Sequence, residues 1–327
     1  MIKLDVSEDV FALKDVFTIS RGSRTQARVV TVKLTDDDLM GWGECVPYAR
    51  YGETVEGVIT EIRHLADEIA SGALDRKSLQ ERLPAGAARN ALDCAFWDLE
   101  AKRAGRPVHE LAGLAAPTAL ETAYTLSLAE PATMRRKAEE NAGRPLLKLK
   151  LGGENDIARL EAVRAGAPQA TIIVDANEGW TAELYSEIAP YLLQLGVAMV
   201  EQPLPVGQDA MLGEIHRPLP VCADESCHDR TSLAGLKGRY DMVNIKLDKT
   251  GGLTEALALR EDALAAGFSL MVGCMVGSSL AMAPAIIAAQ GAAIIDLDGP
   301  LLLAEDRQNP MHYEGSMVWP ASPALWG

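Results

Sequence analysis

The sequence has few basic side chains for its size. Its 327 residues include 31 lysines and arginines against 46 aspartates and glutamates, so the formal net charge is −15. This acidic excess argues against nucleic acid or an anionic membrane surface as the main partner. Hydrophobic residues make up 48% and charged residues 24%, which is ordinary globular composition and excludes a disordered chain. The length suffices for a large core and for two domains.

Paired cysteine motifs and targeting segments are also missing. The five cysteines include no CxxC motif, and their odd number predicts reduced thiols in a cytoplasmic protein. The first ten residues contain three acidic side chains and no apolar run, so we expect no signal peptide there. Residues 263–295 carry no charge, which on length alone would allow a membrane span. Glycines, serines and Pro284 interrupt this stretch and favour a strand, a loop, a buried helix and a second strand.

The first 115 residues have the pattern of an α+β domain. Two β-rich runs lie before residue 36, with a polar segment at residues 20–28 between them that contains Arg21, Arg24 and Arg28. A loop at residues 43–53 follows. The helical patterns come last, over residues 53–71, 75–82 and 85–104.

From residue 119, short apolar runs alternate with helical segments. The eight runs cover residues 122–128, 146–151, 171–176, 197–202, 219–225, 242–247, 268–273 and 292–298. Their polar end residues recur every 22–27 residues, which suits one strand, one helix and two short loops. Eight such strands favour a closed parallel barrel over a doubly wound open sheet. The motifs GxGxxG and Walker A, which would support the open sheet, are absent.

Two lysines lie on one face of the second predicted barrel strand. Side chains alternate along a strand, so Lys148 and Lys150 share a face opposite to the neighbouring leucines. In a barrel that face is the interior, where unpaired ammonium groups would be prohibitively unfavourable. The lysines therefore predict carboxylates opposite them. The alternative is an edge strand with both lysines in solvent.

Three consecutive strands end in carboxylates, at Asp175, Glu201 and Asp224. In a parallel barrel these ends meet at one rim, where active sites lie. Three convergent carboxylates repel one another unless a cation binds among them, and ligation by oxygen alone favours Mg²⁺. The alternatives are that each acid caps a helix or pairs with a separate basic residue. Asn177 either supports the metal ligands or belongs to a turn.

Lys246 ends a strand on the side of the predicted barrel across from Lys150. Two lysines on either side of a metal can move a proton at the α-carbon of a carboxylate. One lysine removes the proton from one face, and the other returns a proton to the opposite face. The cation and the second ammonium are expected to lower the pKa of the lysine that acts as base. The pattern predicts a racemase or epimerase.

Several segments together resemble the muconate-lactonising subgroup of the enolase superfamily. They are residues 87–108 and the motifs KLK (148–150), VDANE (174–178), EQPLP (201–205), ADES (223–226) and NIKLDKTGG (244–252). The resemblance covers nearly the whole chain and implies an α/β protein, with an α+β capping domain (residues 1–115) on a (β/α)7β TIM-like barrel (residues 116–299). Residues 300–327 would return to the capping domain. The superfamily's chemistry implies proton transfer through an enediolate that Mg²⁺ stabilises.

The eighth predicted strand ends in Asp296 and Asp298, which share a face by the same alternation. In the dipeptide epimerases of this subgroup, a D-x-D at this place holds the free amino terminus of the substrate. Residues 20–28, 45–53 and 84–90 also resemble those of proteobacterial L-Ala-D/L-Glu epimerases. The resemblance implies epimerisation of the second residue of a dipeptide, L-Ala-D-Glu to L-Ala-L-Glu, in the degradation of cell-wall (murein) peptides.

The resemblance also assigns the substrate contacts. Arg24 would bind the side-chain carboxylate of glutamate, because a guanidinium suits a carboxylate, with Arg21 or Arg28 as alternatives. Lys148 would help to hold the α-carboxylate, and Thr125 would line the pocket. Residues 43–51 would close over the substrate.

Other functions stay open on the sequence alone. A dipeptide epimerase of different specificity shares the features named so far. An o-succinylbenzoate synthase or a cycloisomerase would not need Asp296 and Asp298, since its substrates lack an amino group there. An inactive homologue would bind a dipeptide without exchanging its α-proton. The sequence also leaves the oligomeric state open, a homo-oligomer included.

Overall fold

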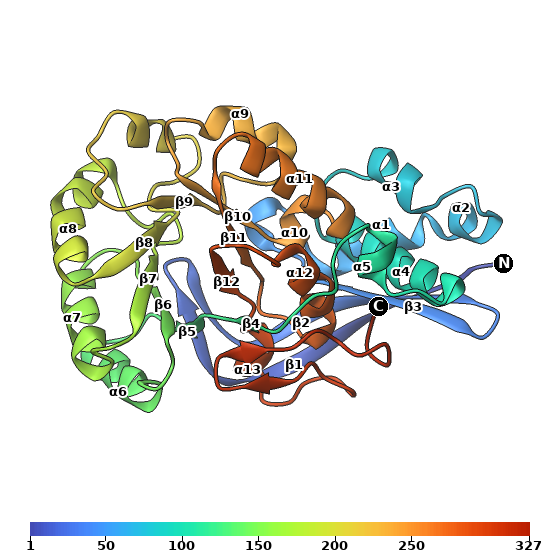
Figure 1. Cartoon of the computed structure of the whole chain (residues 1–327), viewed down its shortest axis with the longest axis horizontal. Coiled ribbons are helices and arrows are strands. Elements are labelled where there is room, and N and C mark those ends of the chain that lie inside the picture. Colours follow the sequence, from blue (N-terminus) through green and yellow to red (C-terminus); the bar gives the residue numbers. More distant parts are fainter.

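The computed structural model describes all 327 residues. Figure 1 shows a barrel of strands and helices on the left and a smaller part, made of a sheet and helices, on the right. The barrel sheet has eight parallel strands, and the N-terminal sheet is separate from it. The expected fold class, a TIM-like α/β barrel with an α+β cap, is confirmed. No helix has the length and apolar composition that crossing a membrane requires.

The cap begins with an antiparallel sheet of three strands. They are β1 (Lys3–Ile19), β2 (Gly22–Asp36) and β3 (Leu39–Cys45), in the order β1-β2-β3. β1 and β2 are longer than the predicted runs, so most of the polar segment at residues 20–28 lies in the hairpin and not in a loop. The tip of the hairpin reaches the barrel, where the Leu128 amide donates a 3.0 Å hydrogen bond to the Thr18 carbonyl (Figure 1).

Helices cover one face of the cap sheet. They are η1 (Ala49–Tyr51), α1 (Val55–Arg63), α2 (Ala66–Ser71), α3 (Arg76–Arg82), α4 (Ala87–Ala104) and α5 (Val108–Leu111). The predicted helix at residues 85–104 corresponds to α4, which is buried along most of its length and ends at Gly105. β3 lies very close to α4, because a Cβ on Gly43 would be 2.1 Å from the Ala91 carbonyl oxygen. Glycine is therefore required there.

The barrel strands follow the predicted order with shorter bounds. They are β5 (Tyr124–Leu126), β6 (Leu146–Lys150), β7 (Thr171–Asp175), β8 (Val197–Glu201), β9 (Val221–Ala223), β10 (Met242–Ile245), β11 (Ser269–Gly273) and β12 (Ile294–Asp296). Each strand pairs with the next in parallel. The Ala123 amide donates a 2.8 Å hydrogen bond to the Ile295 carbonyl, which joins the two ends of the sheet. The barrel is therefore closed.

The barrel helices differ in length. Full helices are α6 (Pro131–Glu140), α7 (Asp156–Gly166), α8 (Ala182–Gln194), α11 (Leu253–Ala265) and α12 (Ser279–Ala288). Short ones are η2 (Asp209–Gly213), η3 (Arg230–Ser232), α9 (Leu233–Leu236), α10 (Leu247–Thr250) and α13 (Gly299–Leu302). The helical segments expected after β8 and β9 are thus only single turns. The uncharged stretch at residues 263–295 holds β11, a loop, the buried α12 and β12, as expected.

The last residues run back to the cap. β13 (Tyr313–Glu314) and β14 (Met317–Val318) form a small sheet with β4 (Leu120–Glu121). The indole of Trp326 then donates a 3.0 Å hydrogen bond to the Cys94 carbonyl in α4. Trp319 lies near the turn of the small sheet, where its ring packs against His312.

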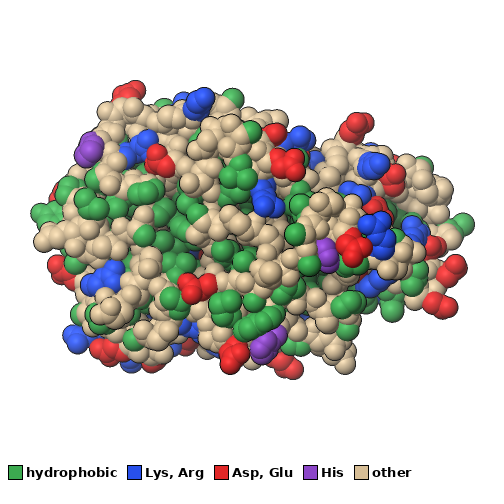
Figure 2. All heavy atoms as spheres, in the orientation of Figure 1, with side chains coloured by type: hydrophobic (Ala, Val, Ile, Leu, Met, Phe, Trp, Pro, Cys, Tyr) green, Lys and Arg blue, Asp and Glu red, His purple; other side chains and the backbone are tan.

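The surface in Figure 2 carries acidic and basic side chains scattered over the face in view, mostly toward its margins. No broad patch of one sign is visible on this face. The acidic excess is therefore spread out on it.

Candidate active site

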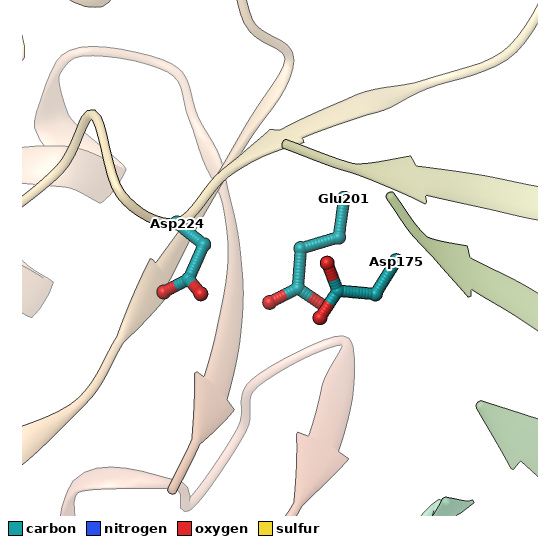
Figure 3. A group of neighbouring side chains, drawn as sticks. All are labelled: Asp175, Glu201 and Asp224. Atoms are coloured by element: carbon teal, nitrogen blue, oxygen red, sulfur yellow. The ribbon is translucent and has the colours of Figure 1, made fainter. Parts of the chain in front are cut away.

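Three buried carboxylates come together at the ends of neighbouring barrel strands. Asp175 ends β7, Glu201 ends β8 and Asp224 follows β9, and one oxygen of each lies within 4.8 Å of the others. Figure 3 shows the three groups turned toward a common centre. The backbone amide of Asn177 donates a 2.9 Å hydrogen bond to Asp175 Oδ1, and the side-chain Nδ2 of Asn244 donates a 2.7 Å hydrogen bond to Glu201 Oε1. These bonds fix the carboxylates in convergent positions.

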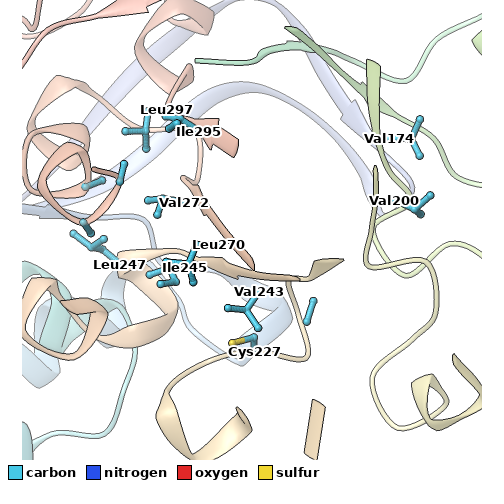
Figure 4. Close-up of a cluster of buried hydrophobic side chains, with 14 of the residues drawn as sticks. Val174, Val200, Cys227, Val243, Ile245, Leu247, Leu270, Val272, Ile295 and Leu297 are labelled. Atoms are coloured by element: carbon cyan, nitrogen blue, oxygen red, sulfur yellow. The ribbon is translucent and has the colours of Figure 1, made fainter. Parts of the chain in front are cut away.

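Alternation along the strands produces this arrangement. A deeper layer of the barrel interior is apolar, with Ile173, Met199, Cys222, Met242 and Met271 packed together. Two positions further along the first three of these strands, the interior side chains are the three carboxylates. The residues between them point outward and join the large core under the helices, where Figure 4 shows Val174 and Val200 on one side of the barrel and Val243 and Ile245 on another.

Two lysines flank the carboxylates from opposite sides of the barrel. Lys150 Nζ lies 2.6 Å from Asp175 Oδ2, and Lys246 Nζ lies 2.7 Å from Asp224 Oδ2. Lys150 ends β6 and Lys246 follows β10, which are four strands apart in a sheet of eight. Both side chains are buried. The structure therefore brings together the two lysines and three acids that the sequence singled out.

The carboxylate partners of Lys246 govern its pKa in the protein. Burial disfavours the charged form of Lys246, but the carboxylates of Asp224 and Glu201 outweigh burial and raise the pKa well above its usual value. Lys150 and Lys246 each form an ion pair with one of the three acids. A divalent cation among the carboxylates would compete for the same oxygens.

The three acids fit a hard cation by their donor atoms. They offer carboxylate oxygens only, which is the ligand type that Mg²⁺ prefers. One oxygen, Glu201 Oε2, lies 2.5 Å from Lys148 Nζ but lacks hydrogen-bond geometry, and the buried Asn177 Oδ1 has no partner either. Glu201 Oε2 is thus in an ion pair only, and Asn177 Oδ1 is a buried acceptor without a donor.

Lys148 lies beneath this group and is 1% exposed. Its ammonium is 2.7 Å from Asp296 Oδ2 and 3.3 Å from Asp175 Oδ2, in addition to its contact with Glu201. Burial disfavours the charged form, but the surrounding carboxylates raise the pKa well above its usual value. Lys148 therefore connects two of the candidate metal ligands with the D-x-D pair.

The two aspartates of the D-x-D pair have different surroundings. Asp296 pairs with Lys148, whereas Asp298 Oδ2 accepts a 2.6 Å hydrogen bond from the Thr125 amide. Burial and the nearby Asp296 raise the pKa of Asp298 to about 7. Thr125 belongs to β5 and is 7% exposed. Thr125 therefore supports Asp298 through its backbone amide.

A cavity of about 40 Å³ lies between the hairpin and the barrel mouth. Among its lining residues are Phe17, Arg24, Lys150, Asp224, Lys246 and Cys274. The three arginines of the hairpin differ in their partners. Arg21 binds Glu178 and Glu225, and Arg28 binds Glu8 and Glu56 at the surface. Arg24 makes no hydrogen bond or ion pair, and its guanidinium lies 5.5 Å from the centre of the Phe17 ring. It is therefore free to bind an anion.

Two buried charged residues were not predicted. Lys249 Nζ donates to Asp224 Oδ1 at 2.7 Å and to the Asn244 carbonyl at 2.8 Å, so it holds one of the three acids in place. The sequence feature that could have indicated Lys249 is that NIKLDKTGG contains a second lysine, three residues after Lys246. Glu225 lines the cavity next to Asp224, and burial together with Asp224 raises its pKa to about 7.

Known proteins match the chain over both of its parts. Residues 1–113 match the N-terminal domain of the mandelate racemase/muconate lactonizing enzymes, and residues 133–322 match the enolase C-terminal domain-like family. The chain belongs to the mandelate racemase/muconate lactonizing enzyme family. The resemblance to the enolase superfamily that the motifs indicated is thereby confirmed.

Two curated members of this family are similar in sequence. One is the L-Ala-D/L-Glu epimerase of Escherichia coli K12, which is 48% identical over 96% of this chain and 98% of the relative. The other is the N-acetyl-D-glutamate racemase of a Pseudoalteromonas species, which is 45% identical over 91% of this chain and 95% of the relative.

Two solved structures of family members are similar in fold. An enolase family member of Agrobacterium tumefaciens with homology to dipeptide epimerases, with bound sodium and L-Ala-L-Glu and an ordered loop, matches with a TM-score of 0.98, 55% identity and full coverage of both chains. The dipeptide epimerase of Enterococcus faecalis V583, complexed with Mg and L-Leu-L-Tyr, matches with a TM-score of 0.90 and 29% identity over 99% of each chain.

Proposed function

We propose that this protein epimerises the second residue of acidic dipeptides, L-Ala-D-Glu to L-Ala-L-Glu in the first place, with Mg²⁺ as cofactor. The observation that carries the proposal is the placement of Lys150 and Lys246 on opposite sides of three buried carboxylates. The relatives named above support it, since they act on or bind dipeptides and acylated glutamate.

The two lysines would exchange protons with opposite faces of the α-carbon. One amine accepts the α-proton as the C–H bond breaks, and the ammonium across the site donates a proton to the other face. The carbon is thereby inverted with no net change in protonation. Proton transfer by a positioned side chain contributes roughly 10²–10⁴-fold to rate.

Asp175, Glu201 and Asp224 would hold the metal, since their oxygen donors fit Mg²⁺ and the Enterococcus faecalis relative contains Mg. When bound, Mg²⁺ would offset the negative charge that develops on the substrate's α-carboxylate. Lys148 is proposed to assist at the α-carboxylate, and its contacts also hold Glu201 and Asp296 in place.

Arg24 is proposed to bind the side-chain carboxylate of the second residue of the substrate. It lines the cavity and has no partner within the protein, so a substrate carboxylate would satisfy it. Asp296 and Asp298 are proposed to bind the free amino terminus, with Thr125 fixing Asp298 through its amide. This set selects a dipeptide with an acidic second residue.

Racemisation of N-acylated glutamate is a second candidate. It is favoured by the Pseudoalteromonas relative and by the ion pair between Asp296 and Lys148, which already occupies one of the two carboxylates needed for an ammonium group. Such a substrate keeps the side-chain and α-carboxylates but has no charged amino terminus.

Incubation in deuterated water with Mg²⁺ separates these candidates. L-Ala-D-Glu, L-Ala-L-Glu and N-acetyl-D-glutamate are each followed by mass spectrometry for uptake of one deuteron and by chiral chromatography for inversion. We expect rapid exchange of both dipeptides, slower exchange of the acylated amino acid, and loss of all exchange with EDTA. Exchange of N-acetylglutamate alone would replace the first candidate by the second, and no exchange would refute both.

The proposed setting is degradation of cell-wall peptides in the cytoplasm. Five free cysteines, four of them buried, support a reducing compartment. Accumulation of L-Ala-D-Glu in extracts of a strain that lacks the gene would test the setting. A homo-oligomer stays a prediction, which gel filtration with light scattering checks.

A further inference from the structure

One barrel carboxylate binds both loops of the cap that lie over the site. Glu178, in the loop after β7, accepts from Arg50 Nε at 2.7 Å and from Arg50 Nη2 at 2.8 Å, which is a bidentate pair. Its Oε2 also accepts from Arg21 Nη1 at 3.2 Å. Arg21 lies at the hairpin tip and Arg50 in the turn after β3. Glu178 therefore joins two cap segments to the barrel.

Further bonds tie the same segments together. The Asn177 carbonyl accepts from Arg21 Nη1 at 2.7 Å and from Ser20 Oγ at 3.0 Å. The second terminal nitrogen of Arg21 donates to Tyr48 Oη at 2.8 Å and to Glu225 Oε1 at 2.7 Å. Besides the backbone hydrogen bond from Leu128 to Thr18, these side-chain bonds hold the hairpin tip at the barrel mouth.

The backbone at this point is unusual. Asn177 and Glu178 have φ angles of +45° and +65°, and neither is a glycine. Two consecutive side-chain-bearing residues in the left-handed region are unfavourable, and such geometry persists where surrounding contacts enforce it. The Val206 amide, which donates 2.9 Å to Glu178 Oε1, is one of these contacts. The carboxylate is therefore presented to the cap in a fixed position.

The hairpin tip and the turn around Arg50, together called the cover below, leave little room at the lysines. The cavity next to Lys150 and Lys246 measures about 40 Å³, whereas sites for small molecules typically measure about 300–1,000 Å³. A neighbouring hollow of about 410 Å³ shares Arg21, Arg24 and Tyr48 with this cavity, so a dipeptide reaches the lysines only if these side chains of the cover move. Arg24, which is proposed to bind the side-chain carboxylate of the substrate, lies three residues after Arg21 on the same hairpin. Opening and closing of the hairpin therefore decides whether Arg24 faces the substrate.

We propose that Glu178 is a positioning residue that holds both cap segments closed through its ion pairs with Arg21 and Arg50. Closure in turn places Arg24 over the substrate. This role of Glu178 is called the latch below. This inference rests on the proposed function for its substrate, but the latch itself does not. Glu178 touches neither the lysines nor the substrate carbon. Its loss acts on closure and not on proton transfer.

The test compares Glu178→Gln with Glu255→Gln. Glu255 in α11 forms a similar pair with Arg230, at 3.1 Å, and neither residue bonds to Arg21 or Arg50, so this pair controls for loss of an arginine–carboxylate pair. For Glu178→Gln, we expect KM for L-Ala-L-Glu to rise about tenfold with kcat within about threefold, as for an interaction that acts on binding. Glu255→Gln should leave both constants unchanged.

Trypsin gives a second readout that needs no substrate. The cover contains three cleavage sites, after Arg21, Arg24 and Arg50, and cleavage follows the open population when opening is fast. We expect cleavage at these sites to accelerate about tenfold in Glu178→Gln, and cleavage after Arg21 and Arg24 to accelerate about tenfold in Arg50→Gln, which lacks the third site. Glu255→Gln should show no acceleration. Arg50→Gln breaks the same pair from the cap side, in case the first variant folds poorly.

The outcomes separate the two proposals. Unchanged KM and unchanged cleavage in folded Glu178→Gln and Arg50→Gln overturn the latch. Faster cleavage in both variants, with no turnover of any dipeptide by the unmodified protein, supports the latch and refutes the proposed function. An equal effect of Glu255→Gln on cleavage also overturns the latch, since the effect would then be general.

Discussion

Replacement of Arg24 by methionine tests how the site selects its substrate. Arg24 has no partner in the protein, so its removal breaks no internal contact, and methionine keeps an apolar stem against Phe17. Burial lowers the pKa of the guanidinium, because a buried charge without a partner is disfavoured. A substrate carboxylate would restore that partner. The variant should therefore lose substrate binding while it keeps its fold.

The expected loss can be worked out from the bonds involved. A hydrogen bond to a charged group contributes about 1.5–3 kcal/mol, and a guanidinium gives a carboxylate two of them. A combined loss of about 3 kcal/mol lowers kcat/KM by a factor of about 10². L-Ala-L-Gln has no side-chain charge, so its kcat/KM should change by less than about threefold.

Deuterium uptake at the α-carbon, followed by mass spectrometry, measures both substrates in the same way. Arg28→Met is the matched control, because Arg28 lies on the same hairpin but is paired with Glu8 and Glu56 at the surface. We expect the control to keep its full activity on L-Ala-L-Glu. Equal losses on both substrates, or no loss on L-Ala-L-Glu, would refute the role given to Arg24.

Three further predictions concern chemistry and stability. Lys150→Ala and Lys246→Ala should each abolish epimerisation, yet each should still exchange the α-proton of one diastereomer, a different one in each variant. If neither variant exchanges either diastereomer, the two-base mechanism is contradicted. Gly43→Ala places a methyl group 2.1 Å from the Ala91 carbonyl oxygen, so overpacking of about 1–3 kcal/mol should lower the melting temperature by several degrees, and an unchanged value contradicts this. Burial raises the pKa of Asp248 from 3.8 to about 7, so the folded protein retains a proton that the unfolded chain releases. The stability that protonated Asp248 contributes is full below about pH 4 and is lost as pH rises through about 7. The melting temperature of Asp248→Asn, relative to that of the wild type, should therefore increase between about pH 4 and about pH 7.

The convergence of the residues that we propose to carry the chemistry could be predicted, because their placement follows from local pattern. Strand alternation places Lys148 and Lys150 on one face, and the regular spacing places Asp175, Glu201 and Asp224 at one rim. Neither step requires knowledge of a distant contact. The helix α4 was predicted for the same reason, since its spacing and its terminal Gly105 are local signals.

The cover could not be predicted in the same way. Arg21, Arg24 and Arg28 are equivalent in the sequence, and only distant partners distinguish them. Arg21 meets Glu225 across 204 residues, whereas Arg24 meets no side chain of opposite charge. The length of β1 was also missed, because its pairing with β2 is interrupted between Ala12 and Phe17 and resumes only at the tip, over residues 17–19 and 22–24. Partners remote in sequence leave no periodic signal.

The same long separation has a consequence for how the protein is made. The hairpin leaves the ribosome before the barrel, and Glu225 follows Arg21 by 204 residues, which takes roughly 10–40 s at a synthesis rate of about 5–20 residues per second. Leu13, in the same hairpin, forms its bridge with Leu303 later still. During that interval the hairpin has no barrel to contact, and its apolar residues Phe17 and Ile19 lack their partners Val276 and Leu303. The cover of the active site is thus synthesised before the barrel that it closes, and its apolar side chains stay exposed to aggregation until their barrel partners have been made.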